Sequence, residues 1–362
     1  LGGTAAGDEG AEPELQPMFH ALNRGEKSLT IDFKDPAGWN ILRELIRRSD
    51  VIVENFSPGV LERAGLGYAK LAADQPDLIV LAMSAVGQTG PLSDTIAYAP
   101  TTMALGGITG VTGYRDGRVL MPQIAYGDVS ASLHAVYAVL AALVYRAKTG
   151  RGQYIDFAQE EATAVCLPEP LLDYQLNGRV AGPQDNDQAG YAPHNTYPCR
   201  PDDSGLDRWV SIAIRTDEEW RRLVEAIGSP EWALDPACAT VAGRWAACES
   251  LDARLSEWTS DQTAWEVTER LQAVRVAAFP VQNVQDEYFD PHYQEREVFV
   301  HVDHPIVGTL ALPSLAWKLS ETPGRITGPA PTLGQHNDYV LRELLGLPDE
   351  EVGRLAERGV LT

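Results

Sequence analysis

One acidic residue, Asp128, lies where a carboxylate could act as a nucleophile. It belongs to residues 124–130, IAYGDVS, directly before a long apolar segment that predicts a helix. Backbone N–H groups and the helix dipole hold a carboxylate at a helix N-terminus ionised and aimed. Such a carboxylate can attack an activated acyl group. Helix capping explains the same position, and it is the more common role of an aspartate there.

Two other patterns invite a chemical interpretation that their spacing does not support. The glycine-rich residues 105–113, LGGITGVTG, lack the GxGxxG spacing and no P-loop lysine follows, so they predict a close-packed turn. His301 and His304 fall on a predicted strand, where residues three apart point to opposite faces. We therefore expect no metal site there. The sequence contains no GxSxG elbow, HExxH helix or EF-hand loop.

Composition limits the class of ligand and the compartment. The chain has 362 residues, enough for roughly two to three domain-sized units, and its net charge is −22. This charge opposes binding to nucleic acid and to anionic membranes, so local basic groups must hold any anionic ligand. The four cysteines show no CxxC pair, which predicts reduced thiols and a cytoplasmic protein. The apolar run 129–144 is expected to be too short and too interrupted to span a bilayer.

In the first half of the chain, predicted strands alternate with predicted helices, and these elements must position the residues named above. Residues 1–17 predict a loop or linker. Alternation predicts a strand over 27–33, apolar runs predict buried strands over 50–54 and 78–83, and helical periods cover 36–48 and begin at 58–63. Strands that alternate with helices predict a Rossmann-like parallel sheet. Ligands gather at the carboxyl ends of such strands, here residues 54–59 and 84–91.

In the second half of the chain the predicted strands and helices do not alternate regularly. A strand is predicted over 208–215, helices over 216–227, 250–260 and 263–272, strands over 298–302 and 308–312, and a helix over 334–345. We therefore expect a large α/β domain of residues 18–194 and 296–362 and a small α+β domain of residues 195–295.

Several motifs, taken in order, resemble the signature of the class III CoA-transferase family, the CaiB/BaiF and formyl-CoA transferase-like proteins. In the first half they are NFSPGVLERAGLGY at 55–68, GQTGP at 87–91, Gly127 with Asp128, and TGRGQ at 149–153. In the second half they are APHNTYPC at 192–199, DPH at 290–292, HPIVG at 304–308 and APTLGQH at 330–336. The resemblance extends from about residue 18 to the end of the chain.

This resemblance implies an interlocked dimer whose large domain binds coenzyme A and whose small domain closes the site. It assigns the catalytic aspartate to Asp128. It further implies the adenine and phosphate contacts Asn55, Phe56 and Arg63, and a basic segment near the phosphates that contains Arg24 and Lys27. An ordinary solvated charge is the alternative for each of these cations. His194 is expected to contact a substrate carboxylate or to be a partly buried hydrogen-bonding histidine.

The expected activity is transfer of CoA between an acyl-CoA donor and a carboxylic acid acceptor. Asp128 attacks the thioester, the CoA thiolate returns to the aspartyl carbonyl, and the acceptor carboxylate reverses both steps. N–H groups of Gly106 or Gly107 are candidates to stabilise the oxyanions. No metal or other cofactor is implied, and a homodimer or a second transferase half is the expected protein partner.

Three departures from the family pattern bear on the alternatives. The family's usual first strand is absent before Leu1, so we also consider a CoA-binding, non-catalytic half of a fused or hetero-oligomeric transferase. The family's racemases place a histidine before an aspartate where this chain has Tyr98 and Ala99, which weakens an acyl-CoA racemase or isomerase and leaves Tyr98 as a substrate-side candidate. Residues 183–190 lack the glycine run of the oxalate transferases, which argues against oxalate as substrate.

Overall fold

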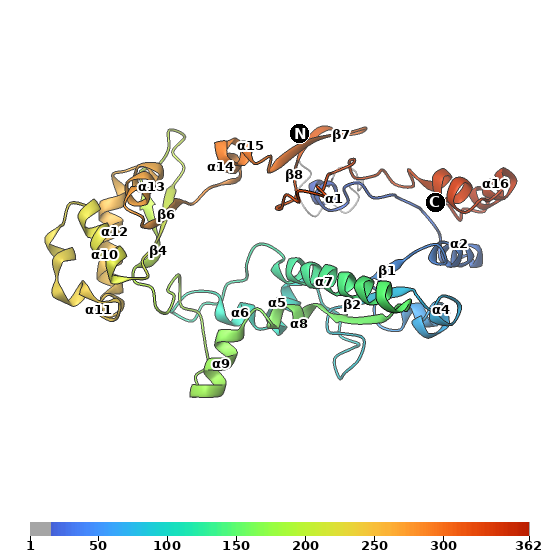
Figure 1. The fold of residues 1–362 in the computed structure, drawn as a ribbon, viewed down its shortest axis with the longest axis horizontal. Helices are drawn as coiled ribbons and strands as arrows, with labels where there is room; N and C mark the ends of the chain where they lie inside the picture. The colour runs from blue at the N-terminus through green and yellow to red at the C-terminus, as the bar shows by residue number, and fades with distance from the viewer. Residues whose placement is uncertain (1–15, 362) are drawn as a thin grey trace. The chain divides into compact units, whose positions relative to one another are not determined.

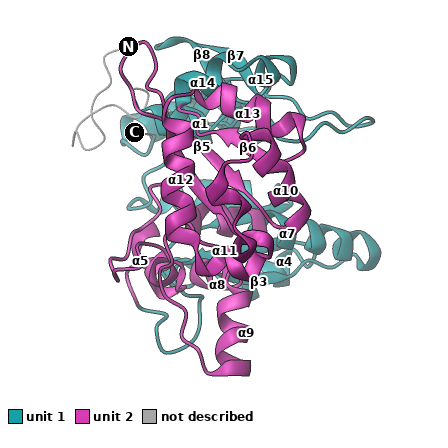
Figure 2. Ribbon diagram, turned by 90° about the vertical axis from the view of Figure 1, so that its left-hand side faces the viewer, with its two compact units in different colours: residues 1–94, 135–157, 284–362 teal, residues 95–134, 158–283 magenta. Residues whose placement is uncertain are grey.

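The computed structural model describes residues 16–361 (Figure 1). The predicted linker of residues 1–17 lies outside this range except for Gln16 and Pro17, which are the N-cap and first residue of α1. The chain divides into two compact units (Figure 2). Unit 1 contains the chain up to Asp94 and residues 135–157 and 284–362, and unit 2 contains residues 95–134 and 158–283. The contacts therefore group residues 95–134 and 158–194 with the segment predicted as the small domain.

Unit 1 is built around a sheet with the strand order β1-β2-β3, in which β1 and β2 are parallel. This agrees with the predicted α/β class. Its elements before residue 160 are α1 (Pro17–Leu22), α2 (Pro36–Ile46), β1 (Val51–Glu54), α3 (Val60–Arg63), α4 (Tyr68–Asp74), β2 (Ile79–Ser84) and β3 (Tyr154–Ala158). The remaining elements of unit 1 are α14 (Val284–Phe289), α15 (Pro291–Glu295), β7 (Phe299–His304), β8 (Gly308–Pro313), the π-helix η4 (Tyr339–Leu344) and α16 (Asp349–Glu357).

The middle strand of this sheet forms the core of unit 1. Ile79, Val80 and Leu81 are almost completely buried, as expected of an apolar run between two neighbouring strands. The edge strand β1 was also predicted to be buried, but Val53 is exposed because β1 has a neighbour on one side only. Helix α2 begins where Asp35 caps the N–H of Ala37 and proline occupies the first turn.

Two predictions in unit 1 were wrong or incomplete. Residues 27–33 are extended but form no strand, because their backbone groups bond to residues near the C-terminus: Thr30 N–H to Asn337 Oδ1 and Asp32 N–H to Val360 O. The predicted helix over 334–345 is reduced to η4 after a turn at Gly334. His301 is exposed and His304 is buried on β7, in line with their predicted opposite faces.

Unit 2 has its own antiparallel sheet, β4-β5-β6, and its own core. The helices that begin after Thr216 and Thr263 start at capping boxes with Glu219 and Glu266. Its elements are α5 (Ala99–Leu105), α6 (Ile108–Val111), α8 (Gln159–Ala164), α9 (Pro168–Asn177), β4 (His194–Cys199), β5 (Arg208–Ala213), α10 (Asp217–Ala226), η2 (Glu231–Leu234), η3 (Pro236–Ala239), α11 (Val241–Ala246), α12 (Cys248–Ser260), α13 (Ala264–Ala273) and β6 (Ala277–Pro280). The predicted strand and three helices of this segment are confirmed.

The long helix α7 (Tyr126–Thr149) contains the division between the units. It has 24 residues, and an 18-residue window within it has a mean hydropathy of 1.5, so by length and composition it could cross a membrane. The helix continues at both ends beyond the apolar run 129–144, so it is longer than the run on which the prediction was based. Length and composition of this kind also fit a core helix of a soluble protein.

Candidate active site around Asp128

Asp128 lies in the first turn of α7 as its third residue. The helix begins two residues earlier, at Tyr126, and the Asp128 N–H donates to the Ala125 carbonyl at 3.0 Å. The prediction that Asp128 precedes the helix was therefore wrong in detail, and Asp128 does not occupy the cap position. Its side chain still lies at the positive end of the helix dipole.

A side chain that the sequence did not single out contacts the carboxylate. Gln159 donates a hydrogen bond from Nε2 to Asp128 Oδ1 at 3.3 Å. Strand β3 ends at Ala158 and α8 begins at Gln159, so this amide stands at the carboxyl end of a strand. That is the kind of position at which α/β proteins place ligand-binding groups, and it was the available signal for Gln159.

Glycines let three helices approach closely around the aspartate. A Cβ atom added at Gly127 would lie 3.2 Å from Met103 Cγ and from Thr163 Oγ1. A Cβ atom at Gly106 would lie 2.8 Å from Thr163 Cβ and 2.9 Å from the Glu160 carbonyl oxygen. The first turn of α7 and the end of α5 therefore both pack against α8, and this packing fixes the direction of the Asp128 side chain.

Partial burial raises the pKa of the Asp128 carboxyl above the ordinary aspartate value. We expected backbone N–H groups to hold the carboxylate ionised, but among the described residues the hydrogen bond recorded for it comes from Gln159. A carboxylate that solvent stabilises poorly is a better nucleophile when it is ionised.

The direction of this shift gives a prediction about stability. A carboxyl whose pKa is higher in the folded than in the unfolded state favours folding when protonated, and this contribution is lost as pH rises through the folded pKa. We therefore expect Asp128→Asn to unfold at a higher temperature than the wild type at neutral pH. The difference should shrink as pH falls through the raised folded pKa toward the ordinary aspartate value, which thermal melts between pH 3.5 and 7.5 would measure. A variant less stable at neutral pH would contradict the burial argument.

A small polar cluster around Cys166 joins the first two turns of α7 to α8 and to the residues that follow α8. Ser130 Oγ donates to the Ala162 carbonyl at 2.7 Å and lies 3.5 Å from Cys166 Sγ. The Tyr126 hydroxyl donates to the same sulfur at 3.8 Å, and this hydrogen bond raises the pKa of Tyr126. These contacts hold the helix start in place but put no further charge beside Asp128.

The glycine and tyrosine candidates lie on α5 or directly beside it. The Gly106 N–H donates to the Thr102 carbonyl and the Gly107 N–H to the Ala104 carbonyl, so both amides already have partners within unit 2. Their predicted oxyanion role would require these bonds to be exchanged. Tyr98 is the N-cap residue of α5, and its side chain is 77% exposed.

His194 begins β4, and a carbonyl group fixes its tautomer. Its Nδ1 lies 2.5 Å from the Asn186 carbonyl oxygen, which can only accept a hydrogen bond, so Nδ1 carries a proton. In the neutral ring Nε2 is therefore the free acceptor. The ring also packs edge-on against Tyr191, with 5.4 Å between the ring centroids. Both descriptions that the sequence left open, a hydrogen-bonded histidine and a substrate contact, are compatible with this geometry.

The coenzyme A candidates belong to unit 1. Phe56 follows β1, is 47% exposed, and its N–H donates to Glu54 Oε2 at 2.7 Å. Gly59 adopts the left-handed conformation with φ 78°, and a Cβ atom there would lie 2.8 Å from Arg63 Nη1. The glycine therefore allows the Arg63 side chain to fold back over the turn after β1.

The other two basic candidates of unit 1 are engaged by the C-terminal part of the chain. Arg24 donates to the Pro313 carbonyl, and Lys27 Nζ lies 4.6 Å from the centre of the Tyr339 ring. Both contacts use the cation without neutralising it, so the positive charges remain available to an anion.

A pocket of about 560 Å³ opens in unit 1 beside Gly59 and Glu62, after the end of β1. The Tyr68 and Tyr154 rings, 5.5 Å apart at their centroids, line it together with the Glu62 and Asp156 carboxylates. Burial, followed by Asp156 and other nearby carboxylates, raises the pKa of Tyr154 to about 12. The GQTGP motif reaches this pocket through Gln88, whose N–H donates to Asp156 Oδ1 at 2.7 Å. The sequence did not identify the two tyrosines as pocket residues.

Comparison with known proteins places these features in a family. The model of CoA-transferase family III matches residues 5–337. The chain is 33% identical to the succinyl-CoA–D-citramalate CoA-transferase of Chloroflexus aurantiacus, with 94% of this chain and 83% of that protein covered. It is 35% identical to the succinyl-CoA–L-malate CoA-transferase beta subunit of the same organism, with the same coverage. It is 31% identical to the formyl-CoA:oxalate CoA-transferase of Bradyrhizobium sp., with 95% and 84% covered.

A solved structure supports the same grouping. A CaiB/BaiF family protein from Brucella suis matches with a TM-score of 0.82 and 29% identity, covering 91% of this chain and 84% of that chain. The likeness therefore extends over both units of the chain and is not confined to one motif.

Proposed function

The chain belongs to CoA-transferase family III, and we propose that it moves coenzyme A from an acyl-CoA donor to a carboxylic acid acceptor through a thioester on Asp128. The observation that carries the proposal is a half-buried carboxylate in the first turn of α7, with a raised pKa and an amide donor on one oxygen. Such a group is weakly solvated and aimed, as covalent catalysis requires.

The proposed steps balance without water or a further reactant. A carboxylate oxygen of Asp128 attacks the donor thioester carbonyl, the C–S bond breaks, and CoA leaves as the thiolate. The thiolate attacks the aspartyl carbonyl of the mixed anhydride and releases the donor as its carboxylate. The acceptor carboxylate then attacks the aspartyl thioester, and the returning thiolate completes the new acyl-CoA. The Gln159 amide is placed to donate to the oxyanion on the aspartyl carbon.

Mass spectrometry of the intact protein tests this proposal most directly. After incubation with a panel of acyl-CoA donors and no acceptor, the protein should carry one CoA in thioester linkage, and hydroxylamine should remove it. Peptide mapping should place the resulting hydroxamate on Asp128. A protein that transfers CoA without any covalent adduct on this residue would contradict the mechanism.

The names of the relatives guide the choice of substrates. Two of them use succinyl-CoA with a hydroxylated dicarboxylic acid, and one uses formyl-CoA with oxalate. We therefore propose a short-chain acyl-CoA as donor and begin the panel with succinyl-CoA. The missing glycine run at residues 183–190 keeps oxalate a less favoured acceptor.

For the cofactor, we propose that its phosphates lie by Arg63, Arg24 and Lys27. The pocket of unit 1 is lined by two carboxylates, Glu62 and Asp156, and by Lys70, so its net negative charge repels a phosphate and it suits an uncharged part of the cofactor. Asn55 and Phe56 stand at the end of β1 for contacts with the adenine end.

Arg63→Ala is expected to raise the KM for acyl-CoA about tenfold and to leave kcat nearly unchanged, since a charge-assisted hydrogen bond to phosphate contributes roughly 1.5–3 kcal/mol. The effect should weaken in high salt, because the lost interaction is ionic. Steady-state kinetics at two salt concentrations measures both quantities. Arg47→Ala on α2, where the arginine pairs with Glu44, is the matched surface control. An unchanged KM in Arg63→Ala would remove this residue from the proposed site.

We propose a homodimer as the functional assembly. One face of α7 exposes apolar side chains at helical spacing: Val136, Tyr137, Leu140 and Val144 are each more than half exposed. An apolar stripe of this kind is typical of a protein interface. Some relatives are alpha or beta subunits of a transferase, so a second, different half is the other candidate partner.

Light scattering should therefore give the wild type about twice the chain mass of 39.4 kDa. Leu140→Glu should shift the protein toward the monomer, because it puts a charge into the apolar stripe. A monomeric wild type that becomes active only with a second chain would favour the hetero-oligomer.

The free cysteines and the strongly negative charge support a cytoplasmic protein that binds neither nucleic acid nor membrane.

A further inference from the structure

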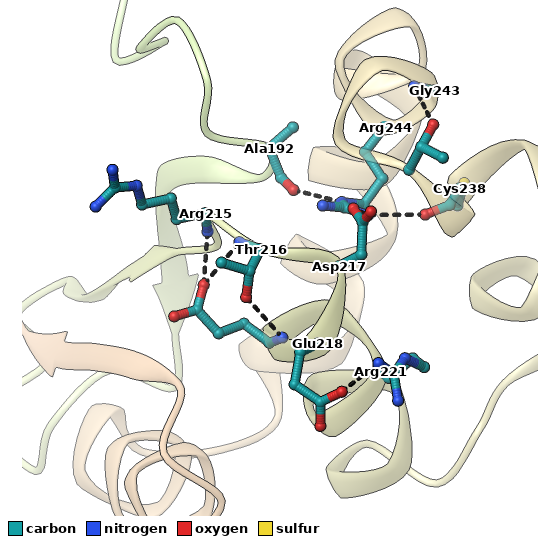
Figure 3. Close-up of polar contacts among 11 residues, drawn as sticks. Ala192, Arg215, Thr216, Asp217, Glu218, Arg221, Cys238, Gly243 and Arg244 are labelled. Atoms are coloured by element: carbon teal, nitrogen blue, oxygen red, sulfur yellow. Dashed lines mark hydrogen bonds and ion pairs between the residues drawn. The ribbon is translucent and has the colours of Figure 1, made fainter.

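Unit 2 contains a completely buried arginine, Arg244, on α11 (Figure 3). Its Nε–H donates to the Ala192 carbonyl at 2.7 Å, and Nη1–H donates to the Cys238 carbonyl at 3.0 Å. Asp217 lies 3.0 Å from Nη1 with half of its side chain exposed. The guanidinium therefore joins α11 to the start of α10 and to the chain just before β4.

The pairing of this cation does not explain its burial. A buried guanidinium loses its hydration, and one partly solvated carboxylate recovers only part of that cost. Nη2 is buried and has no hydrogen-bond partner among the described residues. An apolar side chain would fill the same space without this cost. The guanidinium also lies over the Trp220 ring, 5.4 Å from its centre, but the contact that reaches the chain before β4 is the bond to the Ala192 carbonyl, which an apolar residue could not supply.

The contact with Ala192 fixes the chain corner that precedes His194. Ala192 N–H donates to the Ile214 carbonyl, and Ile214 N–H donates to the Pro193 carbonyl. Together with Arg244, these bonds hold the backbone on both sides of the Ala192–Pro193 peptide, and His194 is the next residue.

The His194 ring is held from its other side by a chain of amide contacts. Its Nδ1 donates to the Asn186 carbonyl, Asn186 Nδ2 donates to Asn195 Oδ1 at 2.9 Å, and Asn195 Nδ2 donates to Asp252 Oδ2 at 2.8 Å. The ring direction thus depends on three supports: this network, the pairing of His194 with Ala213 between β4 and β5, and the backbone corner that Arg244 holds. The network alone fixes the hydrogen-bond partner of the ring but not the position of its Cα atom.

We infer that Arg244 is a positioning residue for the acceptor acid and acts through His194. The inference rests on the proposed function and takes the substrate-contact alternative for His194, in which the Nε2 side of its ring meets the acceptor carboxylate. Arg244 holds the backbone corner from within the core, so the ring is in place before the acid arrives and no ordering cost is paid on binding.

A double-mutant cycle separates positioning from a general effect on folding. Arg244→Lys keeps the charge but cannot bond both carbonyl groups, and it should raise the KM for the acceptor about tenfold, within the range of coupling between residues in one network. The yield of enzyme-bound CoA thioester from the donor alone should not change. In a His194→Ala background the same lysine substitution should have no further effect on the acceptor KM. Asp217→Asn, which removes the countercharge and leaves both carbonyl contacts intact, is the matched control: it should lower the stability and keep the acceptor KM of the wild type.

The result that overturns the inference is an additive cycle, or a donor KM that rises as much as the acceptor KM. A readout that needs no turnover completes the test. The His194 ring resonance in NMR, assigned by His194→Ala, should shift in Arg244→Lys and stay in place in Asp217→Asn. A wild type that forms no CoA thioester with any donor would refute the proposed function, and the resonance comparison would still decide whether Arg244 positions His194.

Discussion

Asp128→Ala is expected to abolish CoA transfer, lowering kcat by about 10⁴-fold or more, as removal of a covalent nucleophile does in other enzymes. The substitution removes the only group in the proposed cycle that bonds to both the acyl carbon and CoA. Because alanine has no charge to desolvate, the variant should also fold at least as stably as the wild type at neutral pH. Loss of activity with retained stability would separate chemistry from folding.

Glu160→Gln provides the matched control for this prediction. Glu160 is also a partly buried carboxylate, follows Gln159 on α8, and has a pKa raised by burial and then by Glu161. It should retain transfer activity and the CoA adduct, since the mechanism gives it no bond to make. An Asp128→Ala protein that still carries CoA in thioester linkage would place the nucleophile elsewhere.

Gln159→Ala is expected to lower kcat by about 10²-fold with little change in either KM, the usual effect of removing one oxyanion donor. The amide donates to Asp128 Oδ1 in the free protein, and the same N–H faces the oxygen that becomes negative when the thiolate attacks the aspartyl carbon. Stopped-flow measurement of adduct formation and decay would locate the effect in the steps at the aspartyl carbon.

Gln159→Glu distinguishes hydrogen-bond donation from space filling. It preserves the shape of the side chain but removes the N–H and places a second carboxylate beside Asp128, whose pKa should then rise further. We expect lower activity than in Gln159→Ala and an acid limb of the pH–rate profile moved to higher pH. Activity equal to the wild type in both variants would show that the amide has only a packing role.

The sequence predicted the elements whose formation depends on local rules. The apolar run of β2 has few alternatives to a buried strand, and Thr216 with Glu219 starts α10 at the predicted place. The alternation over residues 27–33 predicted a strand that does not form. An alternating pattern indicates which side chains face inward, but it does not indicate whether a neighbouring strand is present. The partners are instead residues such as Asn337 and Val360, some 300 positions away.

The site was predictable where it depends on a motif and not where it depends on tertiary proximity. Asp128 could be selected from its position before a long helix, although the exact start of that helix could not. Gln159 is separated from Asp128 by the whole of α7 and β3, and no local pattern joins them. Tyr68 on α4 and Tyr154 on β3 also meet in the folded chain, and no local pattern joins them either.

The glycine contacts at Gly106 and Gly127 limit how this enzyme could be adapted to other acids. Thr163 packs so closely against Gly106 that the Cβ atom of an alanine at this position would lie only 2.8 Å from Thr163 Cβ. Variants designed to accept bulkier substrates should therefore keep the contacts between α5, α7 and α8 and vary the loop of residues 183–190. Substitutions there leave the close contacts of Thr163 with Gly106 and Gly127 unchanged, and keeping Asn186 preserves the carbonyl that holds His194.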